Sequence, residues 1–311
     1  MMRRQIGRLQ RKLDRATGRG RPVILMYHRV AELAEDPWAL AVSPANFAAQ
    51  IEMLAASRRV VPLQNVLDAP DKPGQVAITF DDGYREIGQA VAPLLARHDC
   101  PATVFLTTGM VGSTREFWWD ELSHLLLEVG VDRDLSYAVA GLRQSIGPNT
   151  GRSERLRLHR NAWAALRSLS PESRRAELAE LARTLGISLA ARETHRVMSP
   201  DEVVALAGSP LTVGAHTVSH PLLPALDRAD QAREIEQSAR ACEEWTGERP
   251  TTFAYPYGAF DSTSVELVRA AGFASAVTVN DGVVTARSDP LRLPRLAVTD
   301  CSADELERAL P

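Results

Sequence analysis

Cysteine is scarce in this chain. Only Cys100, Cys242 and Cys301 occur among 311 residues, and they are odd in number and widely separated. This spacing matches neither a disulfide framework nor a cysteine-ligated metal site, so we expect a reducing compartment. No apolar run approaches the roughly 20 residues of a transmembrane helix, and no apolar core of a secretory signal stands near the start. We therefore expect a soluble, cytoplasmic protein.

A large excess of charge of either sign is also absent, except near the start of the chain. The formal net charge is −3, which gives no global reason to expect a nucleic-acid partner. The first twenty residues instead carry seven basic side chains against one acid, with Ile6, Leu9 and Leu13 at helical spacing. We predict a basic amphipathic helix over residues 1–21. Residues 1–20 could contact an anionic membrane surface, and a solvated, frayed helix explains the pattern equally well.

Two adjacent carboxylates follow a predicted strand. The run Gln75–Ile78 is apolar and rich in β-branched residues, and Asp81, Asp82 and Gly83 come shortly after it. Because the chain leaves the strand here, both carboxylates can reach one cleft although strand side chains alternate in direction. Two such charges need a cation or a shared proton. Alone, the pattern fits an Asp-Gly turn with solvated acids equally well.

A pair of histidines favours the cation. His216 and His220 follow another apolar run, Leu211–Val213. One aspartate and two histidines form a three-ligand set that leaves one coordination position for water. Histidines four residues apart can converge on one ion if they lie on a helical turn, whereas an ordinary core or surface imidazole explains one of them but not both. We therefore predict a metal site formed by one of the two aspartates together with His216 and His220.

Strand-like and helical runs alternate along most of the chain. We predict strands at 23–28, 75–78, 100–106, 211–213, 251–254, 273–279 and 291–298, and helices opening at Ser43-Pro44 and Ser199-Pro200 and spanning about 86–98, 228–246 and 262–271. Strand, helix, strand at this spacing indicates a largely parallel sheet. Helical periodicity dominates from 117 to about 198, which predicts a mostly helical insertion. Site residues at strand ends predict an α/β barrel domain over residues 22–311.

Three motifs resemble those of the polysaccharide deacetylases, carbohydrate esterase family 4. Thr79–Gly83, His216–His220 and Phe253–Gly258 are similar to the first three motifs of that family, in the same order. The similarity spans roughly residues 23 to 298, apart from the insertion. It implies a distorted (β/α)7-type barrel and metal-dependent removal of N-acetyl groups from amino sugars.

The resemblance also implies roles for single residues. Asp81 becomes the general base, and Asp82, His216 and His220 become ligands of one divalent metal ion, which we expect to be Zn²⁺. Metal-bound water is a usable nucleophile near neutral pH, and Asp81, beside the ion but not on it, can accept its proton.

Further residues are expected to contact the substrate or the oxyanion. The Tyr257-Gly258 turn implies a backbone N–H directed at the oxyanion. We expect Tyr84, at the end of the first motif, to belong to the same group. Trp118 and Trp119 could stack on sugar rings, although tryptophans on a helical face are more often core residues.

The chain departs from the family in its later motifs. Ala254 stands where an arginine usually pairs with the catalytic base, Val279–Gly282 shows no clear Asp-Trp motif, and no histidine follows His220 to act as the general acid. These departures, together with Tyr27 and His28, resemble the branch that includes exopolysaccharide poly-N-acetylglucosamine deacetylases.

Two other residues are predicted to fill these gaps. Arg292 and Arg295 interrupt an apolar run that should be buried, and we predict that Arg295 rather than Arg292 pairs with Asp81; two solvated rim arginines are the alternative. His28 ends the first predicted strand on the same side of the barrel. Its unperturbed pKa near 6.5 suits a general acid, and a hydrogen bond to the barrel rim is the alternative.

The sequence therefore predicts a hydrolase. We expect a metal-dependent deacetylase that removes N-acetyl, or N-formyl, groups from amino-sugar residues of a polysaccharide, glycolipid or lipid-linked precursor. A catalytically silent carbohydrate-binding or scaffold protein on the same fold is the alternative: the missing motifs favour it, and the complete set of Asp81, Asp82, His216 and His220 opposes it.

Overall fold

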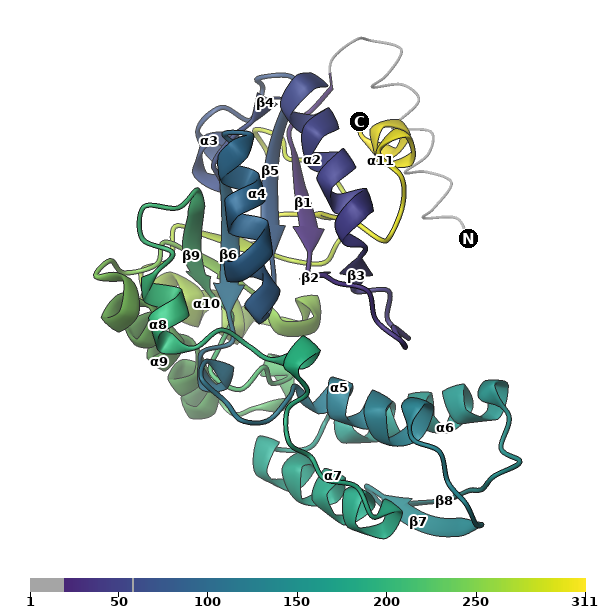
Figure 1. Cartoon of the computed structure of the whole chain (residues 1–311). Helices are drawn as coiled ribbons and strands as arrows, with labels where there is room; N and C mark the ends of the chain where they lie inside the picture. The colour runs from purple at the N-terminus through teal and green to yellow at the C-terminus, as the bar shows by residue number, and fades with distance from the viewer. Residues whose placement is uncertain (1–19, 58) are drawn as a thin grey trace.

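A curled parallel sheet forms the larger part of the molecule (Figure 1). The computed structural model describes residues 20–57 and 59–311, so nearly all of the predicted basic helix over residues 1–21 lies outside the described part. Seven strands follow in the order β11-β10-β9-β6-β5-β1-β12, and a short eighth strand, β4, pairs with β5. Their bounds are β1 Val23–Tyr27, β4 Arg59–Val60, β5 Gln75–Phe80, β6 Ala102–Leu106, β9 Leu211–Ala215, β10 Thr252–Ala254, β11 Ser275–Val277 and β12 Leu296–Ala297.

The last segment of the sheet closes the curl. Leu293 bridges Val277 of β11 in parallel, and β12 pairs with β1. The two ends of the seven-strand path are thus joined, which is the distorted barrel predicted from the sequence. The predicted strand at 291–298 is wrong in length, since only Leu296–Ala297 is regular. Pro294 has no N–H to donate to a ladder, which limits regular pairing before it.

Alternate side chains of the strands point into the barrel. Ile24, Ala77 and Phe105 belong to a buried cluster inside it, whereas their neighbours join the larger core under the helices. The same alternation continues past the end of β5, where Asp81 lies four positions after Ala77. Asp81 is therefore directed into the mouth of the barrel.

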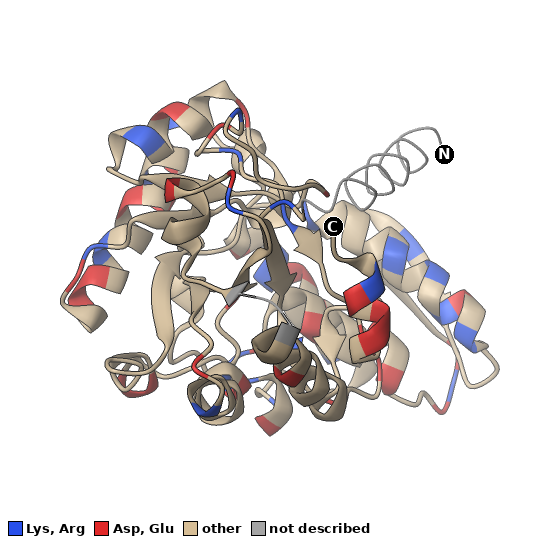
Figure 2. Ribbon diagram, turned by 90° about the horizontal axis from the view of Figure 1, so that it is seen from above, with Lys and Arg blue, Asp and Glu red and all other residues tan. Residues whose placement is uncertain are grey.

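Helices cover the outer face of the sheet, and Figure 2 shows both signs of charge on them. They are α2 Pro44–Ser57, α3 Leu63–Asp68, π-helical η1 Ile87–Val91 continuing into α4 Ala92–Arg97, α8 Pro200–Val204, α9 Arg228–Thr246, α10 Ser262–Ala270 and α11 Ala303–Ala309. Helix α9 has the predicted bounds, because the Asp227 side chain accepts from the Asp230 N–H and Gly247 ends the helix in a left-handed conformation. Helix α11, beside α2, was not predicted.

Short elements complete the barrel part. They are the parallel pair β2 Arg29–Val30 and β3 Ala41–Val42, and the 3-10 turns η2 Thr108–Met110, η4 Glu193–His195, η5 Leu223–Ala225 and η6 Pro256–Gly258. Within the described residues, no helix has both the length and the apolar character needed to cross a membrane.

The predicted helical insertion forms a lobe that faces the carboxyl ends of the strands (Figure 1). It contains α5 Trp118–Ser123 running into π-helical η3 His124–Glu128, α6 Arg152–Leu166, α7 Pro171–Leu185 and an antiparallel hairpin, β7 Leu135–Val139 with β8 Leu142–Ile146. The hairpin was not predicted. Its two-residue turn, Ala140-Gly141, has positive φ values of 49° and 79°, as a tight hairpin requires.

Candidate active site

Asp81 is held by Arg295 at the mouth of the barrel. The Arg295 Nη1 and Nη2 atoms donate to Asp81 Oδ1 and Oδ2 at 2.7 Å each. Arg295 is fully buried and also donates from Nε to the Thr278 carbonyl at 2.9 Å. Arg292 instead lies near the surface beside Asp289. The predicted contact of Arg295 with Asp81 is therefore confirmed, and its role in a reaction stays a prediction.

The ion pair sets the charge of Asp81. Burial alone would raise the pKa of this carboxyl, but the charge and hydrogen bonds of Arg295 outweigh burial and hold the pKa below its usual range. Asp81 is therefore an ionised carboxylate at neutral pH. It can accept a proton there, as a general base must.

Asp82, His216 and His220 converge beside this pair. One ligand atom of each lies within 4.8 Å of the others, and all three residues are buried. Asp82 Oδ1 is 3.8 Å from His216 Nε2 and 3.7 Å from His220 Nε2. Asp82 follows β5 in a left-handed conformation with φ 73°. This turn brings its carboxylate to the same cleft as Asp81, although strand alternation alone would point the two apart.

The two histidines converge without a helix. Residues 216–220 form a loop in which Thr217 and His220 have positive φ values of 65° and 52°. The loop is held by Glu234 of α9, whose carboxylate accepts the N–H groups of Val218 and Ser219 at 2.8 and 2.9 Å. The helical turn considered for the spacing of the histidines is therefore wrong, and an external carboxylate sets the loop instead.

Hydrogen bonding also orients His216. Its Nδ1 lies 2.7 Å from the Ala254 carbonyl, and a carbonyl only accepts, so the ring proton belongs on Nδ1. Nε2 then presents a lone pair towards Asp82, the arrangement common in metal-bound histidines. Ala254, which replaces the expected family arginine, thus supports a ligand through its backbone.

The residues present fit a divalent cation. Asp82 Oδ1, the atom that faces both His216 Nε2 and His220 Nε2, is buried without a hydrogen-bond partner in the described part of the chain. Burial, with the charges of Asp81 and Asp120, raises the pKa of Asp82 well above its usual value, so a cation would relieve a crowded set of carboxylates. Two imidazoles and one carboxylate are a typical Zn²⁺ ligand set.

His28 lies at the same mouth of the barrel. Its Nε2 is 3.9 Å from Asp81 Oδ2, and 19% of its side chain is exposed. Burial lowers the pKa of His28 to about 4, although Asp81 opposes this shift. This value lies below the pKa near 6.5 that was expected for a general acid, and the role of His28 stays a prediction. The position remains suitable for a proton carrier.

The turn at η6 matters for the oxyanion prediction through its backbone N–H groups rather than through its side chains. Tyr257 and Gly258 both have positive φ, at 58° and 64°. The Gly258 N–H already donates to the Tyr255 carbonyl at 2.8 Å. The predicted oxyanion donor therefore falls on the Tyr257 N–H, and this role stays a prediction. A Cβ at position 258 would lie 2.4 Å from Val279 Cγ2, so a side chain there would displace the turn.

Comparison with known families decides what the site belongs to. The model of a family described as polysaccharide deacetylase matches residues 68–133 and 156–276, which is more than half of the chain. The chain belongs to the polysaccharide deacetylase family. It is accordingly a hydrolase of the carbohydrate N-deacetylase class. Curated protein sequences give no match.

Solved structures of low sequence identity share its fold. The Streptococcus pyogenes deacetylase PplD in complex with acetate aligns with a TM-score of 0.62 at 17% identity, over 94% of this chain and 99% of that one. IcaB from Ammonifex degensii aligns with a TM-score of 0.60 at 19% identity, over 93% and 96% of the two chains. A polysaccharide deacetylase from Bacillus cereus gives 0.61 at 17% identity, over 94% and 70%. These likenesses establish the fold alone.

Tyr84 of this deacetylase does not face the substrate. Its side chain is fully buried, and its hydroxyl donates to Asp120 Oδ2 at 2.7 Å and accepts from Trp119 Nε1 at 3.0 Å. The guanidinium of Arg29 lies 4.1 Å from the centre of its ring. This placement does not fit the predicted contact of the Tyr84 side chain with substrate, because the side chain is fully buried and its hydroxyl is hydrogen-bonded inside the protein.

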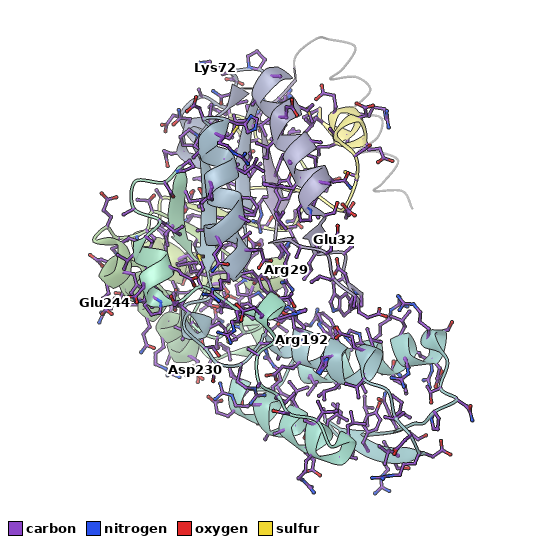
Figure 3. The ribbon with its side chains drawn as sticks, viewed as in Figure 1. Arg29, Glu32, Lys72, Arg192, Asp230 and Glu244 are labelled. Carbon is purple, nitrogen blue, oxygen red and sulfur yellow. The ribbon has the colours of Figure 1, made fainter. Side chains whose placement is uncertain are left out.

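The lobe contributes residues that sequence reasoning missed. Burial raises the pKa of Asp120 to about 7, and Trp119 packs 4.8 Å from the ring of His220. Trp118 and Trp119 are buried, which agrees with the core alternative. Arg29 and Arg192 lie near the junction of barrel and lobe, and Lys72 lies at the opposite end of the barrel (Figure 3). The sequence feature that could have pointed to Asp120 is its position two residues after Trp118.

Proposed function

We propose that this deacetylase removes N-acetyl groups from amino sugars with one Zn²⁺ held by Asp82, His216 and His220. The observation that carries the proposal is the buried Arg295–Asp81 pair directly beside that ligand set. A carboxylate that is ionised, oriented and next to a cation site is the arrangement that hydrolysis of an amide requires.

Asp81 acts as the general base in this proposal. When bound, Zn²⁺ would supply Lewis acidity that polarises the acetyl carbonyl and makes water more acidic. Asp81 accepts the proton of the attacking water, and Arg295 keeps both carboxylate oxygens in place. The two contacts with Arg295 use one lone pair on each oxygen, which leaves the others free to accept.

The N–H of Tyr257 and the ring of His28 complete the proposal. The left-handed turn at Tyr257 directs a rigid backbone donor towards the developing oxyanion. His28 begins neutral, so it must take its proton within the site, where Asp81 is 3.9 Å away. Its partly exposed ring then protonates the leaving amine, since an unprotonated amine anion leaves very poorly.

The substrate we propose is an amino-sugar residue of a polysaccharide, glycolipid or lipid-linked precursor, bearing N-acetyl or N-formyl. A cytoplasmic location is proposed on the scarcity and spacing of cysteine, and peripheral membrane contact through residues 1–20 is proposed on their basic charge pattern. Exopolysaccharide biosynthesis is proposed on the motifs shared with that branch of the family. The basic start of the chain would suit an anionic, lipid-linked substrate.

A substrate panel tests the proposed function. Zinc-loaded protein is incubated with chitooligosaccharides, peptidoglycan fragments and lipid-linked amino sugars, and mass spectrometry follows the loss of one acetyl or formyl group. We expect loss of acetyl from at least one member, abolished by a chelator and restored by added Zn²⁺. Bound zinc without turnover of any member would favour the silent carbohydrate-binding alternative.

A further inference from the structure

A cavity of about 690 Å³ lies between the lobe and the barrel. Its wall is formed by residues 109–118, the first turns of α7, and Val218 and Ser219 from the loop between the two site histidines. This volume falls within the range of roughly 300–1,000 Å³ that small-ligand sites occupy. None of the residues assigned to the proposed reaction lines it, so it adjoins the site without being part of it.

Most charged groups of the cavity wall have partners. Arg115 pairs with Glu121, with an Nη2–Oε2 distance of 2.7 Å, and Glu116 accepts from Arg192 at 2.7 Å. Glu234 accepts the two loop N–H groups described above. These groups are neutralised or satisfied within the protein and do not call for a ligand.

Arg174 is the exception among the buried charged groups of this wall. Only 3% of it is exposed and its Nε is buried without a partner. Tyr257 and Glu172 favour its charged form, but no ion pair with a carboxylate is found within residues 20–57 and 59–311. Its Nη2 donates to the Leu169 carbonyl at 3.0 Å, and its guanidinium lies 4.8 Å from the centre of the Trp118 ring. Burial lowers its pKa. A buried cation without an anion costs several kcal/mol, which indicates that an anion from outside completes the site.

The start of α7 adds positive potential at the same wall. This helix has 15 residues, and Ser170 caps it by accepting from the Ser173 N–H. Pro171 and Arg174, both in its first turns, line the cavity, and a helix N-terminus attracts anions. Glu172 also lines the cavity, but it is exposed to solvent, where water screens its charge.

Tyr257 lies between the wall of the cavity and the predicted ligand His220. Trp118, in the cavity wall, donates from Nε1 to the Tyr257 hydroxyl at 3.2 Å. The Tyr257 ring lies 4.5 Å from the His220 ring. A second cation, Arg167, stacks on Trp163 and approaches the outer side of Tyr257, at 4.9 and 5.8 Å from the ring centres. The rings of Trp118 and Tyr257 thus separate the cavity from His220, and the histidine loop borders the cavity through Val218 and Ser219.

We propose that the cavity binds an anionic group, a phosphate or a carboxylate, carried by the amino-sugar substrate, with Arg174 as the residue that selects it. The proposal rests on the proposed function for the identity of the sugar. It makes Arg174 a specificity-determining residue supplied by the lobe, and it predicts that neutral amino sugars are the poorer ligands.

Binding is measured without turnover on zinc-loaded protein carrying Asp81→Asn. Calorimetry compares N-acetylglucosamine with N-acetylglucosamine 1-phosphate and N-acetylmuramic acid. We expect at least one charged sugar to bind about 10- to 100-fold more tightly than the neutral one, since a charge-assisted contact contributes about 1.5–3 kcal/mol. Preference for the phosphate points to nucleotide- or lipid-linked sugars, and preference for the carboxylate points to muramic-type sugars.

Arg174→Gln should remove this preference, and Arg174→Lys should keep part of it and show that the fold survives. Arg183→Gln is the matched control, because Arg183 lies on the same helix, near its exposed end, and pairs with Glu180. Equal binding of all three sugars by the parent protein, or an unchanged preference in Arg174→Gln, would overturn the proposal. Deacetylation without charge preference would defeat only this proposal, and Arg174-dependent binding without deacetylation of any sugar would defeat only the proposed function.

Discussion

Arg295 and Asp81 form the contact on which the charge of the site depends. The family's usual arginine position is occupied by Ala254, and the guanidinium comes from the segment before β12 instead. Both positions lie at the mouth of the same barrel, so either can reach Asp81. The sequence allowed this prediction because Arg295 interrupts an apolar run, and a buried arginine needs an acidic partner.

Replacing Arg295 should destabilise the fold as well as slow the reaction. Arg295→Leu leaves Asp81 buried without its partner, which typically costs about 3–5 kcal/mol of unfolding free energy. Arg295→Lys keeps the charge but loses the bidentate contact with Asp81, so its free energy of unfolding should lie between those of the parent protein and Arg295→Leu. Arg292→Gln, at the surface, should change the free energy of unfolding by no more than about 0.5 kcal/mol. Urea denaturation measures all three, and equal effects of Arg295→Leu and Arg292→Gln would contradict this account.

His28 can be tested through the leaving group. His28→Ala should keep the bound zinc and the fold, and should slow amide hydrolysis by roughly 10²–10⁴-fold, the usual contribution of a proton-transfer residue. An activated acetate ester needs no protonated leaving group, so its hydrolysis should change much less. Rates on the two substrates are compared for the variant and the parent protein. An equal loss on both, or none on either, would remove His28 from the proposed role.

At the scale of single elements, strands that position the site were predicted better than the loops that shape it. β1, β5 and β6 are buried throughout, and β9 is buried at Leu211, Gly214 and Ala215. The ends of these strands therefore located His28, Asp81 and His216. The left-handed conformations of Asp82 and Thr217 could not be predicted, because contacts distant in sequence hold them. The β7–β8 hairpin was also missed: its strands are largely exposed, and helical periodicity dominates the segments on either side of it.

Replacing Glu234 tests whether this residue holds the loop that carries His216 and His220. Glu234→Ala removes the acceptor for the N–H groups of Val218 and Ser219, so the loop should loosen and zinc affinity should fall by roughly 10–100-fold, as for other residues that support metal ligands. Glu244→Gln, on the exposed face of the same helix (Figure 3), is the control. Competition with a chromogenic chelator measures affinity. Unchanged affinity in Glu234→Ala would show that the loop is held by other contacts.

At the scale of the whole molecule, the site is shared between barrel and lobe. The barrel supplies the predicted ligands and Asp81, and the lobe packs Trp119 against His220 and places Asp120 on the Tyr84 hydroxyl. Motif spacing identified the first group, because those residues follow strands of one sheet. Motif spacing could not identify Trp119 and Asp120, since the lobe and the barrel come into contact only when the chain has folded.

Acid should destabilise the lobe through His159. The ring is fully buried, its Nε2 lies 3.0 Å from Ser123 Oγ, and burial lowers its pKa to about 4. The unfolded chain therefore takes up a proton first as the pH falls from about 6.5 to 4, and the stability contribution of neutral His159 is lost in that interval. The loss is at most about 3.5 kcal/mol, at roughly 1.4 kcal/mol per pKa unit.

His159→Gln should reduce this acid dependence. Urea denaturation between pH 4 and 7 gives the slope of the unfolding free energy for both proteins, and the variant should show the shallower slope whatever its stability at pH 7. His98→Gln, at the end of an outer helix, controls for the loss of one histidine. Parallel curves for His159→Gln and the parent protein would contradict the assignment.

The central claim separates the two adjacent aspartates by role: Asp81 handles the proton, and Asp82 holds the metal. The most direct measurement is zinc content and deacetylation rate, taken side by side for Asp81→Asn and Asp82→Ala. The account predicts that Asp81→Asn keeps near-parental zinc while its rate falls by roughly 10²–10⁴-fold, and that Asp82→Ala loses zinc and activity together. Loss of zinc in Asp81→Asn, or its retention in Asp82→Ala, would contradict the account.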